Sequence, residues 1–488
     1  MESDQEQEHL LQETKNENKN MVLKNKPDEN IINTIIEKLG TGHFSYILIM
    51  KLSTVYFIYG VEMTLLGIIA PFMKCYWSMT DLEVGFMTST VLAGESIGFI
   101  LWGWLGDVYG RKPILVVTLF IVFLFSFLTI FSTNFFWFAA IRLFVGIGVA
   151  SFYIPTCILS EYLPIRMRGV GILASMLSYN FGSTFIAGMA WVFLLHDKWK
   201  VFIGIASAPV LFSLMISLSL PESIRFLANN SKINKLHSIF NDIATAHGKK
   251  QVTREDVESI KPLDSLKDRN FGALFVSRKR GLTTLATTAL LSTCVMIYYG
   301  LIVWNTDLQQ QFLDSDSHGI INNASHHGHQ CQKLKSGDYK QNLIISTSGL
   351  VGTLSSMMLV DSVGRKKPIV FSLMLVAGLI LSLNFKMSYI SFSVVMFLGR
   401  GAISLALSAT NVFINELFST SFRSKANGFA QFCATLFAAL GPYLIQYASH
   451  RSMLTVTILM TVFCIVGAVA CITQRETKDM PVDIDNDS

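Results

Sequence analysis

Charged residues are scarce in this sequence: Asp, Glu, Lys and Arg make up only 15% of its 488 residues, while hydrophobic residues make up 51%. Soluble domains carry about 25% charged residues, so this composition argues against an ordinary soluble protein. Regular alternation of polar and apolar residues is also missing, which argues against an outer-membrane β-barrel. The scarcity of charge therefore predicts a helical protein that spans a membrane.

The usual patterns of nucleotide-binding and catalytic sites are missing as well. No phosphate-binding P-loop occurs, and the Gly-Ile-Gly of residues 146–148 lies in an apolar run, not between a strand and a helix. No Ser, His or Cys grouping has a context that supports catalysis. We therefore expect no enzyme and no cofactor. The net charge of +5 is explained by cytosolic loops, so we expect no nucleic-acid partner.

The two ends of the chain are polar. Residues 1–43 are rich in Asn, Glu and Lys and lack the basic start, apolar core and cleavage site of a signal peptide. We expect residues 1–43 and 475–488 to be disordered tails in the cytosol.

About twelve apolar stretches have the length of about 20 residues that is needed to cross a hydrocarbon core of about 30 Å. Lys and Arg gather between alternate stretches, which places those loops in the cytosol, and an even number of spans places both termini there too. The stretches lie near 46–71, 84–105, 114–132, 136–160, 170–194, 199–220, 282–305, 342–360, 369–387, 390–412, 426–447 and 453–472.

An internal repeat divides these spans into two sets. Three pairs of matching residues are separated by 254 or 255 positions: Asp107 with Asp361, Glu161 with Glu416, and Arg168 with Arg423. Repeats with an even number of spans are related by an axis along the membrane normal. We therefore expect two six-helix halves, residues 44–221 and 282–474, a cytosolic linker over 222–281 and an extracytosolic loop over 306–341.

Several stretches carry a family resemblance. GWLGDVYGRKP, residues 103–113, resembles the loop between spans two and three of the major facilitator superfamily, and DSVGRKKP, residues 361–368, repeats it. RLFVGIG, which begins at Arg142, resembles the superfamily's fourth-span motif. PESIRFL, residues 221–227, is similar to an element of sugar porters and organic-ion transporters.

The first span and YYGLIVWNTDL, residues 298–308, are similar to the synaptic vesicle glycoprotein two family. The short connection over residues 306–341 fits the smaller related proteins of that family. One departure lies in the first span, where Tyr59 stands at a position that is often Asp in this branch, while Glu62 is kept. This departure argues against a cation site built on two carboxylates.

The resemblance implies an alternating-access bundle in which the loop charges latch the cytoplasmic gate. A Gly turn reverses the chain, and a carboxylate four residues after a Gly shares its helix face. The alternative is a solvated basic turn that serves only topology. The latch candidates are Gly103, Asp107, Gly110, Arg111 and Lys112, with Asp361, Gly364, Arg365 and Lys366 in the second half; Glu161, Arg168, Glu416 and Arg423 are expected to form a charge network that holds the halves together.

Ionisable residues inside the spans are functional candidates, because each is costly in a membrane. We favour Glu62 for proton coupling, with a structural carboxylate paired with a hydroxyl or an Arg as the equal alternative. For Glu95 we favour the structural role. Arg142 resembles an arginine linked to proton coupling in the superfamily, and a helix tie is the alternative. Arg400 is only loosely equivalent to it, since their offset is 258.

Polar and aromatic side chains near the middle of the spans are candidates for substrate contact, with ordinary packing as the alternative. Aromatic rings beside an acid would suit an organic cation or a planar solute. The candidates are Tyr298, Tyr299, Trp304, Asn180 and Asn411, with Tyr56 and Gln431 as further polar groups.

The predicted outer loop carries the sequon Asn323-Ala324-Ser325, so we expect a glycan on Asn323. Cys75 and Cys331 fall on the same side, where oxidation is permitted, so we predict a disulfide between them, with two unpaired thiols as the equal alternative. The histidines near Cys331 match no standard zinc spacing, so no metal site is expected.

Two functions remain. The first is a secondary transporter, acting as a monomer, that carries a small organic solute, with organic ions among the candidates, by proton or potential coupling. It would reside in the plasma membrane or in a synaptic-type vesicle membrane. The second is a transporter-shaped membrane protein that recognises or organises other components without transport.

Overall fold

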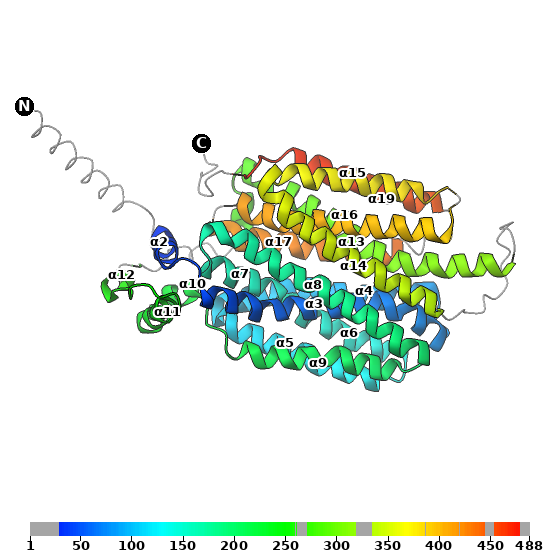
Figure 1. The fold of residues 1–488 in the computed structure, drawn as a ribbon, viewed down its shortest axis with the longest axis horizontal. Helices are drawn as coiled ribbons and strands as arrows, with labels where there is room; N and C mark the ends of the chain where they lie inside the picture. The colour runs from blue at the N-terminus through cyan, green and yellow to red at the C-terminus, as the bar shows by residue number, and fades with distance from the viewer. Residues whose placement is uncertain are drawn as a thin grey trace, which may run out of the picture.

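The computed structural model shows an all-helical bundle, as expected (Figure 1). It describes residues 29–258, 260, 271–318, 334–385, 387–418, 420–444 and 453–478. Over these residues the structure contains no β-strand.

The first half of the bundle consists of six long helical segments. They are α3 (His43–Tyr76), α4 (Asp81–Tyr109), α5 (Arg111–Leu128), α6 (Phe135–Val149) continued by α7 (Tyr153–Tyr162), α8 (Ile165–Phe193) and α9 (Trp199–Ser217).

The second half repeats this arrangement. Its helices are α13 (Arg278–His318), α14 (Ser336–Val363), α15 (Lys366–Ser382), α16 (Tyr389–Leu417), α17 (Thr420–Ala439) and α19 (Met453–Ile472). Within the described residues, ten segments of the bundle are long and apolar enough to cross a membrane. Helices α15 and α17 lie at the positions of the two remaining expected spans. Helix α13 runs to His318 and α14 starts at Ser336, so both ends of the expected loop 306–341 are helical.

The largest packing contacts of the first half have counterparts in the second. Helix α3 packs on α8 as α13 packs on α17, α4 packs on α6 as α14 packs on α16, and α5 packs on α9 as α15 packs on α19. The seam between the halves is itself symmetric, because α4 contacts α17 and α8 contacts α14. In Figure 1 the blue-to-green half and the yellow-to-red half lie against each other along this seam.

Glycines set the closest helix approaches. A methyl group on Gly60 of α3 would lie 1.9 Å from the backbone oxygen of Tyr179 of α8, and one on Gly182 would lie 2.1 Å from that of Phe57. Small residues let helix backbones approach in this way, so that dispersion contacts hold the helices together in lipid. The packing of α3 against α8 is therefore fixed by glycine contacts.

The expected disordered tail over 1–43 is wrong for residues 29–39, which form helix α2 (Glu29–Leu39). Apolar residues three and four positions apart bury one face of α2, namely Ile32, Ile35, Ile36 and Leu39. Glu37 also accepts a hydrogen bond of 2.7 Å from the backbone N–H of Ile165 at the start of α8. Long-range packing, which composition does not report, orders this segment.

The linker between the halves is also partly helical. It contains α10 (Ile224–Asn229), α11 (Ile233–Ala246) and α12 (Arg254–Glu258), and the 3₁₀ turn η5 (Phe271–Phe275). Figure 1 shows α2, α10, α11 and α12 together at one end of the bundle. His247, which follows α11, lies 3.0 Å through Nδ1 from the carbonyl oxygen of Leu39, so the linker contacts α2.

We expect Gly60→Ala to destabilise the bundle by about 1–3 kcal/mol, because the added methyl group forces α3 away from α8. Gly378→Ala is the matched control, since a methyl group there meets no atom within 4 Å. Melting curves of the purified variants, read by size-exclusion chromatography after heating, measure the difference. Equal melting of Gly60→Ala and wild type would show that the close approach is dispensable.

Candidate functional site

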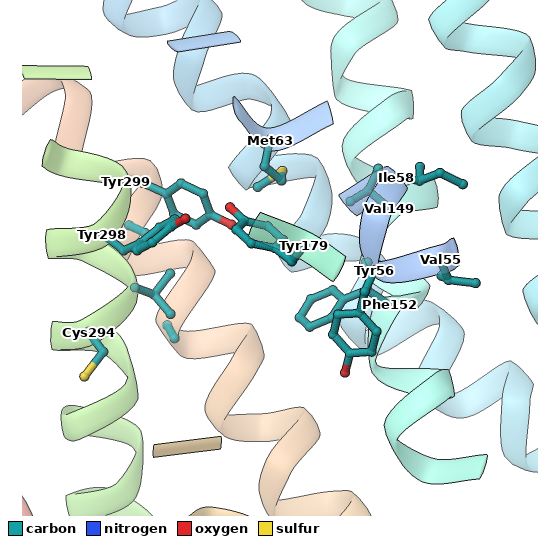
Figure 2. Close-up of a cluster of buried hydrophobic side chains, with 14 of the residues drawn as sticks. Val55, Tyr56, Ile58, Met63, Val149, Phe152, Tyr179, Cys294, Tyr298 and Tyr299 are labelled. Carbon is teal, nitrogen blue, oxygen red and sulfur yellow. The ribbon is translucent and has the colours of Figure 1, made fainter. Parts of the chain in front are cut away.

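A cavity of about 60 Å³ lies where the two halves meet. It has room for a few water molecules. The first half lines it with Tyr56, Tyr59, Phe152, Met176, Tyr179 and Asn180; the second lines it with Val295, Tyr298, Tyr299, Ser404, Leu407, Ser408, Asn411 and Gln431. Figure 2 shows Tyr298 and Tyr299 of α13 on the side of the cluster that faces Tyr179 of α8.

Most of the expected contact residues lie around this cavity. Tyr298, Tyr299, Asn180 and Asn411 all belong to its lining. Trp304 does not: it is fully buried in α13 and absent from the lining, so it packs inside the bundle. The helix rotation that points Tyr298 and Tyr299 into the cavity turns Trp304 elsewhere.

Tyr59, a departure from the family pattern, links the halves. Its hydroxyl donates to Glu95 Oε1 over 2.9 Å and lies 2.8 Å from the hydroxyl of Tyr299. Glu95 is fully buried, and its Oε2 has no hydrogen-bond partner among the described residues. A carboxylate from the first half thus reaches the cavity wall through two tyrosines.

Glu62 forms a buried ion pair instead. Arg142 Nη1 donates to Glu62 Oε2 over 2.6 Å, and Ser126 donates to Oε1 over 2.6 Å. Both charged side chains are fully shielded, and neither lines the cavity. This geometry supports the structural alternative for Glu62, and its coupling role stays a prediction.

Arg400 is a buried cation on the opposite half. Its Nη2 donates to Ser183 of α8 over 2.9 Å, and its guanidinium lies 5.7 Å from the ring centre of Tyr298. Within the described part of the chain no carboxylate pairs with it, and its Nε has no partner. Arg400 also lies one helical turn before the lining residue Ser404. The site therefore places a guanidinium beside the tyrosines of the cavity.

Neutral hydrogen bonds complete the wall of the cavity. Asn180 Nδ2 of α8 donates to Thr353 of α14 over 2.9 Å, and the Thr353 hydroxyl lies 3.2 Å from that of Ser408. Gln431 donates to Asn411 over 3.2 Å. Such bonds contribute only about 0.5–1.5 kcal/mol each, so water or a solute can replace them.

A second polar site lies at the end of the first half that carries the predicted latch. Arg111 pairs with Glu161, and Ser223 donates to the other carboxylate oxygen of Glu161 over 2.6 Å. Glu222 accepts from the backbone N–H groups of Arg111 and Lys112 over 2.8 and 3.2 Å. Glu222 thus neutralises the positive N-terminus of α5.

The second half repeats this site residue by residue. Arg365 donates twice to Glu416, over 2.8 Å each, and Thr477 donates to Glu416 over 2.7 Å. Glu476 accepts from the backbone N–H groups of Arg365 and Lys366 over 3.0 and 3.2 Å. The expected disorder of 475–488 is therefore wrong for its first residues.

The repeat extends to residues that the sequence reading did not single out. Glu222 and Glu476 are 476 − 222 = 254 positions apart, the same interval as the Asp107–Asp361 pair. Gly110 and Gly364 precede the two helices with φ of 103° each, a left-handed backbone that favours glycine. The interval itself would have revealed Glu476.

The partners of the remaining latch candidates differ from the expectation. Glu161 and Glu416 hold Arg111 and Arg365 of their own halves, so these ion pairs tie helices within each half and do not join the two halves. Arg168 donates to the carbonyl oxygen of Leu163 and to Asn33 of α2.

The other latch residues lie near helix ends, and among them Asp107 is exposed and acts electrostatically on Arg111. Gly103 and Asp107 lie toward the end of α4, and Asp361 lies toward the end of α14. Arg423 lies in the first turn of α17. The side chains of Asp361 and Arg423 lie outside the described residues.

Burial raises the pKa of the Glu476 carboxyl, but the backbone N–H groups of Arg365, Lys366, Thr477 and Lys478 outweigh it, so the pKa is lowered overall. The carboxylate is therefore the form that the folded chain favours.

Three residues are expected on the outer side of the membrane, namely Asn323, Cys331 and Cys75. Asn323 and Cys331 lie outside the described residues. Cys75 is disulfide-bonded, and its pairing with Cys331 stays a prediction. No group of His, Cys, Asp and Glu that could hold a metal ion occurs in the described part of the chain.

The sequence matches the family described as "Sugar (and other) transporter" over residues 52–483. The human putative transporter SVOPL (Homo sapiens) is 25% identical over 453 residues, which cover 91% of each chain. The synaptic vesicle 2-related protein of Rattus norvegicus is 25% identical over 456 residues, 92% of this chain and 82% of that protein.

Two solved structures share the fold. The proton:xylose symporter XylE, a protein of the major facilitator superfamily, bound to 6-bromo-6-deoxy-D-glucose, matches with a TM-score of 0.70 at 17% identity, covering 89% of this chain and 96% of that chain. The inward open conformation of XylE from E. coli matches with a TM-score of 0.67 at 17% identity, covering 90% and 98%.

We expect Glu62→Gln to destabilise the bundle by about 3–5 kcal/mol, because it leaves Arg142 buried without a counter-charge. The double variant Glu62→Gln/Arg142→Gln should recover part of the loss, and Glu95→Gln, which uncovers no cation, should lose less than Glu62→Gln. Thermal melting of the purified proteins measures these differences. A double variant less stable than Glu62→Gln would contradict a compensated pair.

We expect Glu476→Gln to melt below wild type at about pH 7. A carboxylate with a lowered pKa stabilises the fold above its unfolded-state pKa and loses that effect as the pH falls through its folded-state value. The difference in melting temperature should therefore shrink as the pH falls below the ordinary value of 4.5. Glu255→Gln, at an exposed glutamate of α12, is the matched control. A difference that does not change with pH would show that the charge of Glu476 is unimportant.

Proposed function

The chain belongs to the sugar (and other) transporter family of the major facilitator superfamily, and from this premise we propose that it is a secondary transporter of a small organic solute. The solute binds in the cavity between the halves, which rock to expose it to each side of the membrane in turn. The observation that carries the proposal is a tyrosine-lined cavity with a few amide and hydroxyl groups, to which both halves contribute residues.

The contacts that close the cavity suit such a motion. Each half is fixed internally by its ion pairs, Arg111 with Glu161 and Arg365 with Glu416. Tyr59–Tyr299 and Arg400–Ser183 are instead single hydrogen bonds across the seam. Rigid halves joined by a few replaceable bonds can change their mutual position without unfolding.

The solute class follows from a charge directly behind the wall, because Arg400 does not line the cavity itself but lies against the ring of the lining residue Tyr298. Arg400 is a buried cation without a carboxylate partner in the described part of the chain. A guanidinium binds a planar carboxylate through two parallel hydrogen bonds, and the tyrosine rings offer flat apolar contact. We therefore favour an organic anion over the organic cation that aromatic residues alone suggested.

The topology and the membrane in which the protein resides can be proposed from its loops and its relatives. Loops rich in Lys and Arg support cytosolic termini. The relatives named synaptic vesicle 2-related protein support a vesicle membrane, with the plasma membrane as the alternative site. Both halves of the cavity come from one chain, which supports a functional monomer.

The test is untargeted mass spectrometry of vesicles that contain the purified protein and are bathed in a carbon-13-labelled cell extract. We expect labelled organic anions to accumulate in wild type and in Arg254→Gln, whose arginine lies on the exposed helix α12. Arg400→Gln should reduce this accumulation at least about tenfold, since a charge-assisted hydrogen bond contributes about 1.5–3 kcal/mol.

Other outcomes would change the conclusion. Accumulation of cations that does not depend on Arg400 would contradict the solute class. If folded wild-type protein accumulates nothing above empty vesicles, transport itself is contradicted, and a recognition role becomes the better account.

A further inference from the structure

Four charged side chains are buried in the middle of the described bundle, and two of them lack an ion-pair partner there. Glu62 and Arg142 neutralise each other. Glu95 and Arg400, one from each half, have no partner of opposite charge among the described residues. Both reach the cavity through a tyrosine that lines it.

Glu95 is surrounded by neutral groups. Tyr59 of α3 donates a hydrogen bond to Glu95, and the hydroxyl of Tyr299 of α13 hydrogen-bonds in turn to the hydroxyl of Tyr59. Helix α6 brings Arg142 toward α4, but that guanidinium binds Glu62. On the α17 side, the next residue of α4, Ser96, meets the hydroxyl of Thr435 over 2.9 Å. No described cation offsets a negative charge on Glu95.

An uncompensated carboxylate in such a place costs several kcal/mol. A proton removes that cost, and Oε2, the oxygen with no partner, is free to hold it. When the cavity opens, water can solvate the ionised form. Closure of the cavity therefore favours uptake of a proton, and opening favours its release.

The hydrogen bonds give this proton a route to the seam between the halves. A tyrosine hydroxyl has one proton to donate, and Tyr59 donates it to Glu95. Tyr299 must therefore donate to Tyr59, so the chain runs from Tyr299 through Tyr59 to Glu95 across α13, α3 and α4. A hydrogen bond to an ionised acceptor is roughly twice as strong as a neutral one. Ionised Glu95 thus strengthens this one contact between the halves, but one stronger hydrogen bond does not offset the larger cost of burying an uncompensated carboxylate, so closure still favours the protonated form.

We propose that Glu95 is the proton-binding group of this protein, and that it moves one proton with each solute through the Tyr59–Tyr299 link. The carboxylate takes a proton from hydronium to give the acid and water when the cavity closes around the solute, and it returns the proton to water on the other side. The proposal rests on the transport function proposed above. It replaces Glu62, whose charge Arg142 already satisfies.

An anionic solute fits this assignment. With Arg400 charged and Glu95 protonated, the closed cavity carries one net positive charge from these two groups, and an organic anion neutralises it. Solute and proton together then cross the membrane without net charge movement.

The first test is infrared spectroscopy of the full-length protein in lipid at about pH 7, which detects the C=O stretch of protonated carboxyl groups. We expect this band in wild type and in Glu62→Gln, and its loss in Glu95→Gln. Tyr59→Phe should keep the band but shift it toward the frequency of a carboxyl that accepts no hydrogen bond. This variant keeps Glu95 and so decides the matter if Glu95→Gln does not fold.

A band that survives in Glu95→Gln, that is lost in Glu62→Gln, or that Tyr59→Phe leaves unshifted would overturn the assignment. The infrared result needs no solute, so it stands apart from any failure of the transport proposal.

The second test uses vesicles with an inward proton gradient, bathed in the carbon-13-labelled cell extract. We expect the gradient to increase solute accumulation by wild type, and this increase to be lost in Glu95→Gln. An equal increase in Glu95→Gln would overturn the role of Glu95 in coupling. Absence of any accumulation by wild type would count against transport and therefore against coupling.

Discussion

Charge inside a membrane has to be neutralised by the protein itself, because the hydrocarbon core supplies no water to solvate it. The bundle meets this constraint at Glu62 and Arg142, whose carboxylate and guanidinium are 2.6 Å apart and fully shielded. It does not meet the constraint at Glu95 and Arg400, which lie on opposite sides of the seam. At the cavity between the halves, a proton can therefore neutralise Glu95 and an anionic solute can neutralise Arg400.

Rigid halves are needed if such a cavity is to open on one side at a time. Each half gains rigidity at the end that carries the latch motif, where Glu222 and Glu476 accept hydrogen bonds from the first N–H groups of α5 and α15. The arginine before each helix is held by a second carboxylate. Because the ion pairs Arg111–Glu161 and Arg365–Glu416 each stay within one half, they stiffen the halves without joining them.

The seam is held by weaker contacts. Close helix approach at glycines fixes α3 against α8 within the first half, whereas hydroxyl and amide groups such as Asn180 and Thr353 meet across the seam. Neutral hydrogen bonds exchange readily with water, so the halves can part there at low cost. Two contacts across the seam involve charged groups: Arg400 donates to Ser183, and the chain from Tyr299 to Glu95 has a strength that depends on the charge of Glu95.

The sequence alone determined the number of spans, the two-half repeat and the latch motif, because length, hydropathy and motif spacing are read along the chain. Tertiary structure decided which charges meet. Helix rotation and packing pair Glu62 with Arg142, 80 residues away, and bring Tyr59 to hydrogen-bond with Glu95. They also place Trp304 outside the lining of the cavity. The same packing ordered α2 and placed the Glu476 carboxylate at the N-terminus of α15. Which charged side chains pair depends on which helix faces meet across long sequence separations, and local sequence patterns do not determine this.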